Sequence, residues 1–144
     1  MSKIEFNGKT IMDTAWIEYQ DLTNSLTMNG CTTNSSDPMQ CLRNGEWVNL
    51  RGSLDVDNSG TSPVNLSSIY VDLPGVCSPS WAPGGATDTC YTVVYTDTTD
   101  LLVAHIHNAG SATQLVFESA QGSTVTTISP GATIRFNINY IRRV

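Results

Sequence analysis

Charge is scarce in this chain of 144 residues. Only 14% of the residues are Asp, Glu, Lys or Arg, and no Lys or Arg occurs between Arg51 and Arg135. Because binding to phosphate groups requires clustered cations, a nucleic-acid partner is not expected. The net charge of -6 makes an anionic membrane surface an equally poor partner, and it favours solubility.

Long hydrophobic runs are also missing. No apolar stretch approaches the roughly 20 residues that a membrane helix needs, so membrane insertion is not expected. No apolar segment follows Lys3, so residues 1–6 do not predict a secretory signal. The sequence therefore predicts a protein made in a cytosol, or one whose signal was removed. The length suits one domain, and 40% hydrophobic residues are not typical of disorder.

Cysteine is infrequent: the chain has Cys31, Cys41, Cys77 and Cys90. Four cysteines allow three pairings. Local Cys31–Cys41 and Cys77–Cys90 disulfides would pin two irregular loops, and they would suit a particle that oxidises after leaving the cell. Free thiols are the alternative, because no signal precedes the domain. Zinc is a third alternative, although no Cys-x-x-Cys pair is present.

The clearest pattern lies at residues 47–56. Apolar residues alternate with polar ones, a period of two that predicts a strand with one face buried and one face wet. The predicted buried face carries Val48, Leu50, Gly52, Leu54 and Val56, and the other carries Trp47, Asn49, Arg51, Ser53 and Asp55. Residues 133–140 alternate in the same way, with Ile134, Phe136, Ile138 and Tyr140 on the apolar side.

The N-terminal region predicts a short hairpin over residues 1–14, because two alternating segments flank Asn7-Gly8. Two strands alone are marginal in water, so the hairpin is expected to lie on the rest of the domain, a neighbouring copy or a docking partner. Residues 16–28 are ambiguous. Trp16, Tyr19 and Leu22 fit a helical turn, but alternation favours a strand at 22–28.

Further short strands follow at regular intervals, with turns rich in Asp, Gly, Ser and Pro between them. They are predicted at residues 40–43, 68–73, 91–96, 101–107, 113–118, 124–128 and 132–141. About nine to eleven strands and no convincing helix predict an all-β, antiparallel β-sandwich or jelly roll. Residues 1–15 are expected to form an attachment hairpin or arm, and 16–144 the sandwich. The long loop at 74–88 is expected to be functional or capping.

The order of these features resembles the C-terminal head domains of bacteriophage tail fibres and receptor-binding proteins. The segments that carry the resemblance are Trp16, Leu26-Thr27-Met28-Asn29-Gly30, Cys41-Leu42-Arg43, residues 44–53, Leu73-Pro74 to Pro79, residues 106–110 and the last strand at 134–140. Residues 3–13 resemble the openings of tail and structural proteins of phages of Gram-positive hosts. The chain departs from the pattern because it has no fibre shaft, coiled coil or long anchor, so a small stand-alone virion component is also compatible.

The resemblance implies a homotrimeric virion structural protein, made in the host cytoplasm, that attaches to the host cell surface. It would contact other virion proteins through residues 1–15 and a host surface glycan or protein through loops at the strand ends. Arg51 projects from the polar strand face, where it could meet an acidic residue of the next chain. Two other functions stay open: a capsid decoration, head-fibre or collar protein, and a lectin-like carbohydrate-binding module outside any virion.

Two sets of residues are candidates for a site. Trp81, with Tyr91 and Tyr95, could form an aromatic platform for sugar rings; alternatively, Trp81 caps the sandwich and the tyrosines belong to the core. His105 and His107 project from the same face of a strand about 7 Å apart. They could bind a metal, three chains donating a pair each around a threefold axis, or they could be half-exposed strand residues.

Catalysis is not expected, and no catalytic residue or cofactor is predicted. The two histidines lack an obvious nucleophile partner, and no Gly-x-Ser-x-Gly segment is present. Sequence spacing places no two carboxylates at the 5–10 Å separation that glycoside cleavage requires. Acidic residues on β-turns are mostly turn formers. Trp47 is expected to pack in a subunit contact or under the N-terminal segment.

Overall fold

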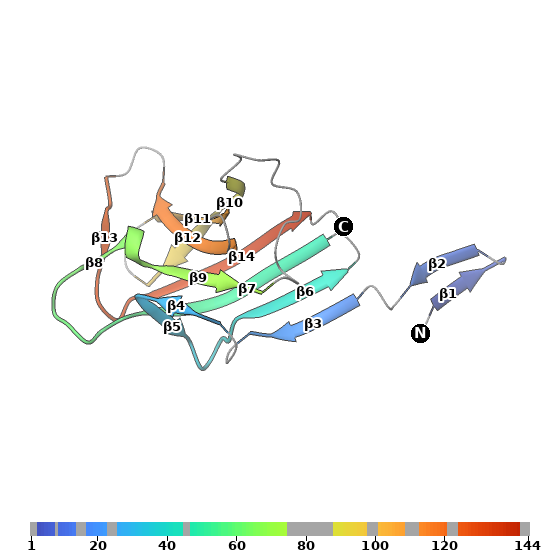
Figure 1. Cartoon of the computed structure of the whole chain (residues 1–144), viewed down its shortest axis with the longest axis horizontal. Helices are drawn as coiled ribbons and strands as arrows, with labels where there is room; N and C mark the ends of the chain where they lie inside the picture. The colour runs from blue at the N-terminus through green and yellow to red at the C-terminus, as the bar shows by residue number, and fades with distance from the viewer. Residues whose placement is uncertain are drawn as a thin grey trace.

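A computed structural model describes residues 3–7, 9–13, 17–22, 26–44, 47–74, 88–97, 101–108, 113–120 and 124–141 (Figure 1). The described part is almost entirely antiparallel β-structure, which confirms the predicted fold class. Its elements are β1 (Lys3–Phe6), β2 (Lys9–Asp13), β3 (Ile17–Asp21), β4 (Met28–Asn29), β5 (Cys31–Thr33), β6 (Gln40–Asn44), β7 (Trp47–Val56), β8 (Val64–Asn65), the 3-10 helix η2 (Leu66–Ser68), β9 (Tyr70–Leu73), β10 (Asp88–Thr96), β11 (Leu101–Asn108), β12 (Thr113–Ser119), β13 (Thr127–Ile128) and β14 (Thr133–Ile141). In these ranges, no helix has the length and apolar character to cross a membrane.

One ten-stranded sheet forms the body, in the order β3-β6-β7-β14-β10-β11-β12-β9-β4, and β5 pairs with β7. Strands β3, β6, β7 and β14 lie side by side in Figure 1, and β11 and β12 lie in the upper left part of the body in that view. The chain leads from the far end of this order back to β7, because β4 pairs with β9 and the next strand, β5, pairs with β7. The sheet therefore folds over itself as a sandwich whose two layers share one core.

Gly30 makes this closure possible. It stands between β4 and β5 with φ +66, at the point where the chain changes partner from β9 to β7. A side chain there would place its Cβ 2.9 Å from the carbonyl oxygen of Ser68. Strands that switch layers do so at bends of this kind, where glycine tolerates both the positive φ and the close approach.

Strand β7 has the predicted alternation, with one exception. Val48, Leu50, Leu54 and Val56 are buried as expected, but Ser53, predicted on the wet face, is buried too. The segment 34–39 covers it: the backbone N–H of Ser53 donates to the carbonyl of Asp37, and its hydroxyl donates to the Asp37 carboxylate. Strands β5 and β6 therefore run along the same edge of β7, separated by this loop.

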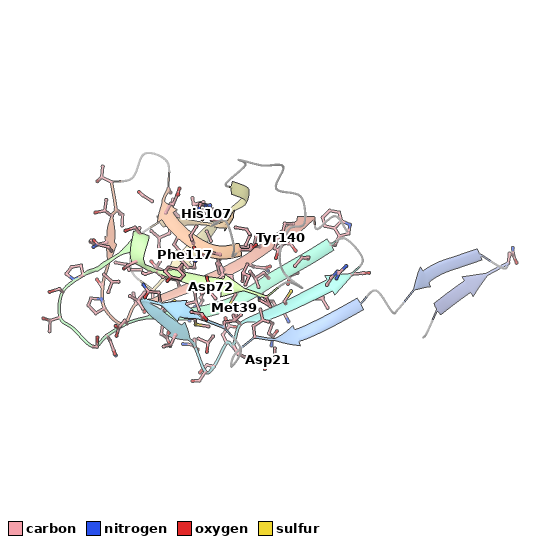
Figure 2. All side chains as sticks on the ribbon, in the orientation of Figure 1. Asp21, Met39, Asp72, His107, Phe117 and Tyr140 are labelled. Atoms are coloured by element: carbon pink, nitrogen blue, oxygen red, sulfur yellow. The ribbon has the colours of Figure 1, made fainter. Side chains whose placement is uncertain are left out.

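The core lies between the layers and contains residues from all the long strands of the sheet. Figure 2 shows side chains of the described residues along the whole body, with Met39, Phe117 and Tyr140 labelled at different points of its length. Leu22 and Met39, both outside strands, are fully buried and are joined by a backbone hydrogen bond of 2.9 Å. Strand β14 has the predicted face, because Ile134, Phe136, Ile138 and Tyr140 are all buried.

The N-terminal prediction is confirmed in part. Strands β1 and β2 form the expected hairpin, with Asn7 at φ 51 in its turn. Figure 1 shows this hairpin standing off one end of the body. The strand prediction at 22–28 is not supported by the described residues: Leu22, Leu26 and Thr27 lie outside strands, Met28 belongs to β4, and β3 lies earlier in that ambiguous stretch. Pairing of β3 with β6 outweighs the local helical spacing.

The Cys31–Cys41 disulfide is contradicted. Cys31 is a buried free thiol. It pairs with Val56 of β7, whereas Cys41 pairs with Leu50 of the same strand. Six positions along a strand span about 20 Å, far beyond the Cα separation of about 4.4–6.8 Å that a disulfide allows. Cys77 lies outside the described residues, and the side chain of Cys90, in β10, is not described.

Burial gives Cys31 a testable pH dependence. Desolvation raises the pKa of this thiol from 9.0 to about 12, because a buried thiolate lacks the hydration it would have in water. The folded protein thus keeps a proton that the unfolded chain releases. We expect the free energy of unfolding to fall by about 1.4 kcal/mol per pH unit as pH rises from about 9 towards 12. Below about pH 9 the thiol is protonated in both the folded and the unfolded chain, so it adds no pH dependence there.

The measurement compares urea unfolding of the protein and of Cys31→Ala across this pH window. Other groups that titrate in the same range affect both proteins, so they cancel in the difference. The slope of the variant should be shallower by the amount stated above. Equal slopes would mean that Cys31 is not buried as a protonated thiol.

Candidate functional site

A groove of about 600 Å³ lies on the outer side of β11 and β12. Its floor comes from alternate residues of these strands and of β9, because Tyr70 pairs with Val116 and Val116 pairs with His105. Helix η2 and residues 125–126 line it as well. We call this the outer groove. Its volume falls within the range of clefts that hold small ligands.

The buried feature of the outer groove is a histidine–carboxylate pair. His105 is only 2% exposed, although its strand position places it opposite the core-facing Ala104 and Ile106. Its Nε2 lies 3.1 Å from Oε1 of Glu118, whose side chain is 59% exposed. The contact is an ion pair when the imidazole is protonated. A buried imidazole therefore lies next to an accessible carboxylate across β11 and β12.

His107 also lines the outer groove but is half-buried. Its ring lies 6.3 Å from that of His105, at an interplanar angle of 79°. The two imidazoles are thus close, as predicted, but the expectation that both are half-exposed was wrong for His105. Among the described side chains, no group of three or more His, Cys, Asp or Glu residues could hold a metal ion. The predicted threefold metal site involves other copies and stays a prediction.

The predicted aromatic platform is only partly described. Tyr91 stands directly opposite His105 in the register between β10 and β11, which places it beside the outer groove. Tyr95 is four positions further along β10, opposite Leu101 and Arg135. The side chains of both tyrosines are not described, and Trp81 lies outside the described residues. The sugar platform therefore stays a prediction.

A second surface is the outward side of β6, β7 and β14, which we call the amide face. The cross-strand register brings together residues that the sequence places on polar strand positions. Trp47 is 62% exposed and Leu42 is 42% exposed, so two large apolar side chains face solvent here. The amide face consists of Gln40, Leu42, Trp47, Asn49, Arg51, Asn137 and Asn139.

Hydrogen bonds order the amide face across its three strands. The Nδ2 group of Asn49 donates to Oδ1 of Asn137 at 2.6 Å and to Oδ1 of Asn139 at 2.9 Å. Arg51 donates through Nε and Nη2 to Oε1 of Gln40, at 3.3 and 3.1 Å. Cross-strand bonds of this kind fix side-chain orientation on a flat sheet surface. Arg51, expected to meet an acidic residue of a neighbouring chain, is held within its own chain by an amide.

A second cavity of about 600 Å³ lies where β5 and β7 end. It contains the carboxylates of Asp55 and Asp57, both of which serve the fold. Asp55 accepts hydrogen bonds from the amide of Asn34 and the hydroxyl of Thr133. Hydrogen bonds from the backbone and side chain of Ser59 lower the pKa of Asp57. Asp57 thus stabilises a turn, and Asp55 links β7 to Asn34 and to Thr133 of β14.

Sequence reasoning found both histidines but missed their surroundings. Tyr70, Gln114 and Glu118 join the outer groove from strands β9 and β12. Strand β12 follows β11 directly in the chain, whereas β9 precedes β10. The available signal was the period of two in β12, because Gln114, Val116 and Glu118 share one side of it. The strand order that places β9 beyond β12 could not be read from the sequence. No family model, curated protein or solved structure matches this chain.

Proposed function

We propose that this chain is a structural protein of a bacteriophage virion, of the tail-fibre or receptor-binding type. In this proposal, it forms a homotrimer, docks on other virion proteins through its N-terminal hairpin, and attaches the particle to the host cell surface. The observation that carries the proposal is the amide face, a flat and ordered surface with an exposed Trp47.

The composition of the amide face supports burial against another copy. Interface centres are enriched in aromatic residues and arginine and depleted in Lys, Glu and Asp. The amide face contains Trp47 and Arg51, and none of its seven residues is Lys, Glu or Asp, although Asp21 of β3 stands next to Gln40 at its edge. Its network of amide hydrogen bonds is already formed, so docking would order few further side chains.

The hairpin supports the docking role. Strands β1 and β2 pair with each other, and they stand away from the body in Figure 1. A two-stranded hairpin is marginally stable in water. A partner that covers it would supply the missing burial, which is the role expected of an attachment arm.

Assembly can be tested through Trp47. We expect the purified protein to have a mass of about three times the 15.5 kDa chain in native mass spectrometry and light scattering. Trp47→Asp should give monomers, because burying an unpaired carboxylate at an interface centre costs several kcal/mol. The matched control is Leu101→Asp: Leu101 is 48% exposed, but it lies on β11, which β10 separates from β14, the nearest strand of the amide face.

The control variant should keep the mass of the unchanged protein. Circular dichroism of each variant verifies that the fold is intact. A monomeric wild-type protein at tens of micromolar, or a Trp47→Asp variant that assembles normally, would refute the trimer formed through the amide face.

The outer groove also supports a second candidate, a lectin-like module outside any virion. A cleft of this volume with a fixed carboxylate suits a small polar ligand. A monomer that binds a sugar and is absent from virus particles would favour this function over attachment. The capsid-decoration alternative differs from attachment only in where the protein lies on the particle.

A further inference from the structure

The outer groove is lined by polar and apolar residues together. Hydroxyl groups of Ser67, Ser119 and Thr126 line it, and so do the apolar side chains of Val116 and Val125. A ligand that fills such a space carries hydrogen-bonding groups around an apolar body. A sugar ring has this character, because its hydroxyl groups project from the rim and its C–H groups form a face.

The outer groove carries carboxylate charge without a balancing Lys or Arg. None of its lining residues is Lys or Arg. Glu118 brings a carboxylate that is 59% exposed, and its Oε1 lies 3.1 Å from Nε2 of the buried His105. The neighbouring carboxylate of Asp72 accepts a hydrogen bond of 2.8 Å from Nε2 of Gln114, another lining residue. An anionic ligand would face like charge here, whereas a cationic group would find a positioned partner.

We infer that the outer groove binds an amino sugar with a free amine, whose ammonium group meets the carboxylate of Glu118. The sugar ring lies over Val116 and Val125, and the hydroxyl groups of the sugar bond to Ser67, Ser119 and Thr126. This inference rests on the proposed attachment role for its biological meaning, but binding does not require a trimer.

A matched pair of ligands tests the inference on the purified full chain. Glucosamine oligomers and N-acetylglucosamine oligomers of the same length differ only in the charge and acetylation of the amine. Calorimetry at about pH 6 keeps the free amine protonated, since comparable amino groups titrate near 7.7–8.0. We expect the amine form to bind at least about tenfold more tightly, the range of a hydrogen bond between charged groups.

Variants then assign the amine contact to one carboxylate. Glu118→Gln should weaken the binding of the glucosamine oligomer by about tenfold. It should leave the affinity for the N-acetylated oligomer within about twofold of the unchanged protein. Asp57→Asn is the control: it removes the same charge from an exposed carboxylate that does not line the outer groove. It should leave both affinities within about twofold, because an exposed charge at a distance is screened.

Each other outcome overturns the inference. Equal binding of the two oligomers, binding of neither, or an unchanged glucosamine affinity in Glu118→Gln would exclude the ammonium–Glu118 contact. A lysine-containing peptide is a third ligand, and its binding as tightly as the amino sugar would show that the outer groove selects an amine rather than a sugar. Loss of the trimer with retained amino-sugar binding would refute the proposed assembly alone, so the two failures are distinguishable.

Discussion

Replacing Gly52 with alanine is expected to lower the free energy of unfolding by about 2–5 kcal/mol. Gly52 has φ +144, a conformation that side-chain-bearing residues rarely adopt. A Cβ there would also lie 2.7 Å from Cα of Met39 and 3.0 Å from the carbonyl oxygen of Pro38. Both contacts are with backbone, so no rotamer change relieves them, and the segment 34–39 would have to move off β7.

Urea denaturation at one protein concentration measures this loss. The control is Gly60→Ala, since the nearest atom to a Cβ at Gly60 is 4.0 Å away and the position has no positive φ. Its effect should stay within about 0.5 kcal/mol. A Gly52→Ala protein as stable as the unchanged one would show that the segment 34–39 does not pack on β7 as described.

Leu50→Ala is expected to cost about 2–5 kcal/mol, the range for deleting a buried leucine side chain. Leu50 is fully buried in the middle of β7. It stands between Cys41 of β6 and Ile138 of β14 in the register, so its loss leaves a cavity bounded by strands on both sides. Strand backbones fixed by pairing on both edges relax little, which keeps the cost high.

Leu101→Ala provides the comparison for this core prediction. The same atoms are removed, but Leu101 is 48% exposed, so the cost should stay below about 1 kcal/mol. Unfolding of both variants is followed by the same denaturant titration. If the two substitutions cost the same, the assignment of β7 to the centre of the sandwich is wrong.

The alternation of residues predicted the main strands well. Strands β7 and β14 pair over their whole length, and each has a buried face that a period of two identifies. The exceptions come from segments that are remote in the sequence or that loop out. Ser53 is covered by the loop 34–39, and no local pattern indicates that this loop closes over it. Gly52, a glycine inside a strand, was the one available signal of a close backbone approach.

The candidate site was predictable only in part. The alternation of β11 placed His105 and His107 on one side of a strand, and the structure brings them into one groove. The burial of His105 and the position of Glu118 depend on pairing with β12, and Tyr70 joins through β9. Similarly, Gly30 is the bend at which the chain changes partner from β9 to β7 and the sheet closes, and this role depends on pairing with strands that are remote in the sequence.

The central claim is that this chain lies on the surface of a virion and mediates attachment. The most direct measurement is immunogold electron microscopy of purified intact particles with an antibody raised against this chain. The proposed function predicts gold at the distal end of the tail, in clusters consistent with trimers. Gold confined to the capsid would favour a decoration role, and particles that carry none of this chain would contradict the claim that it is a virion protein.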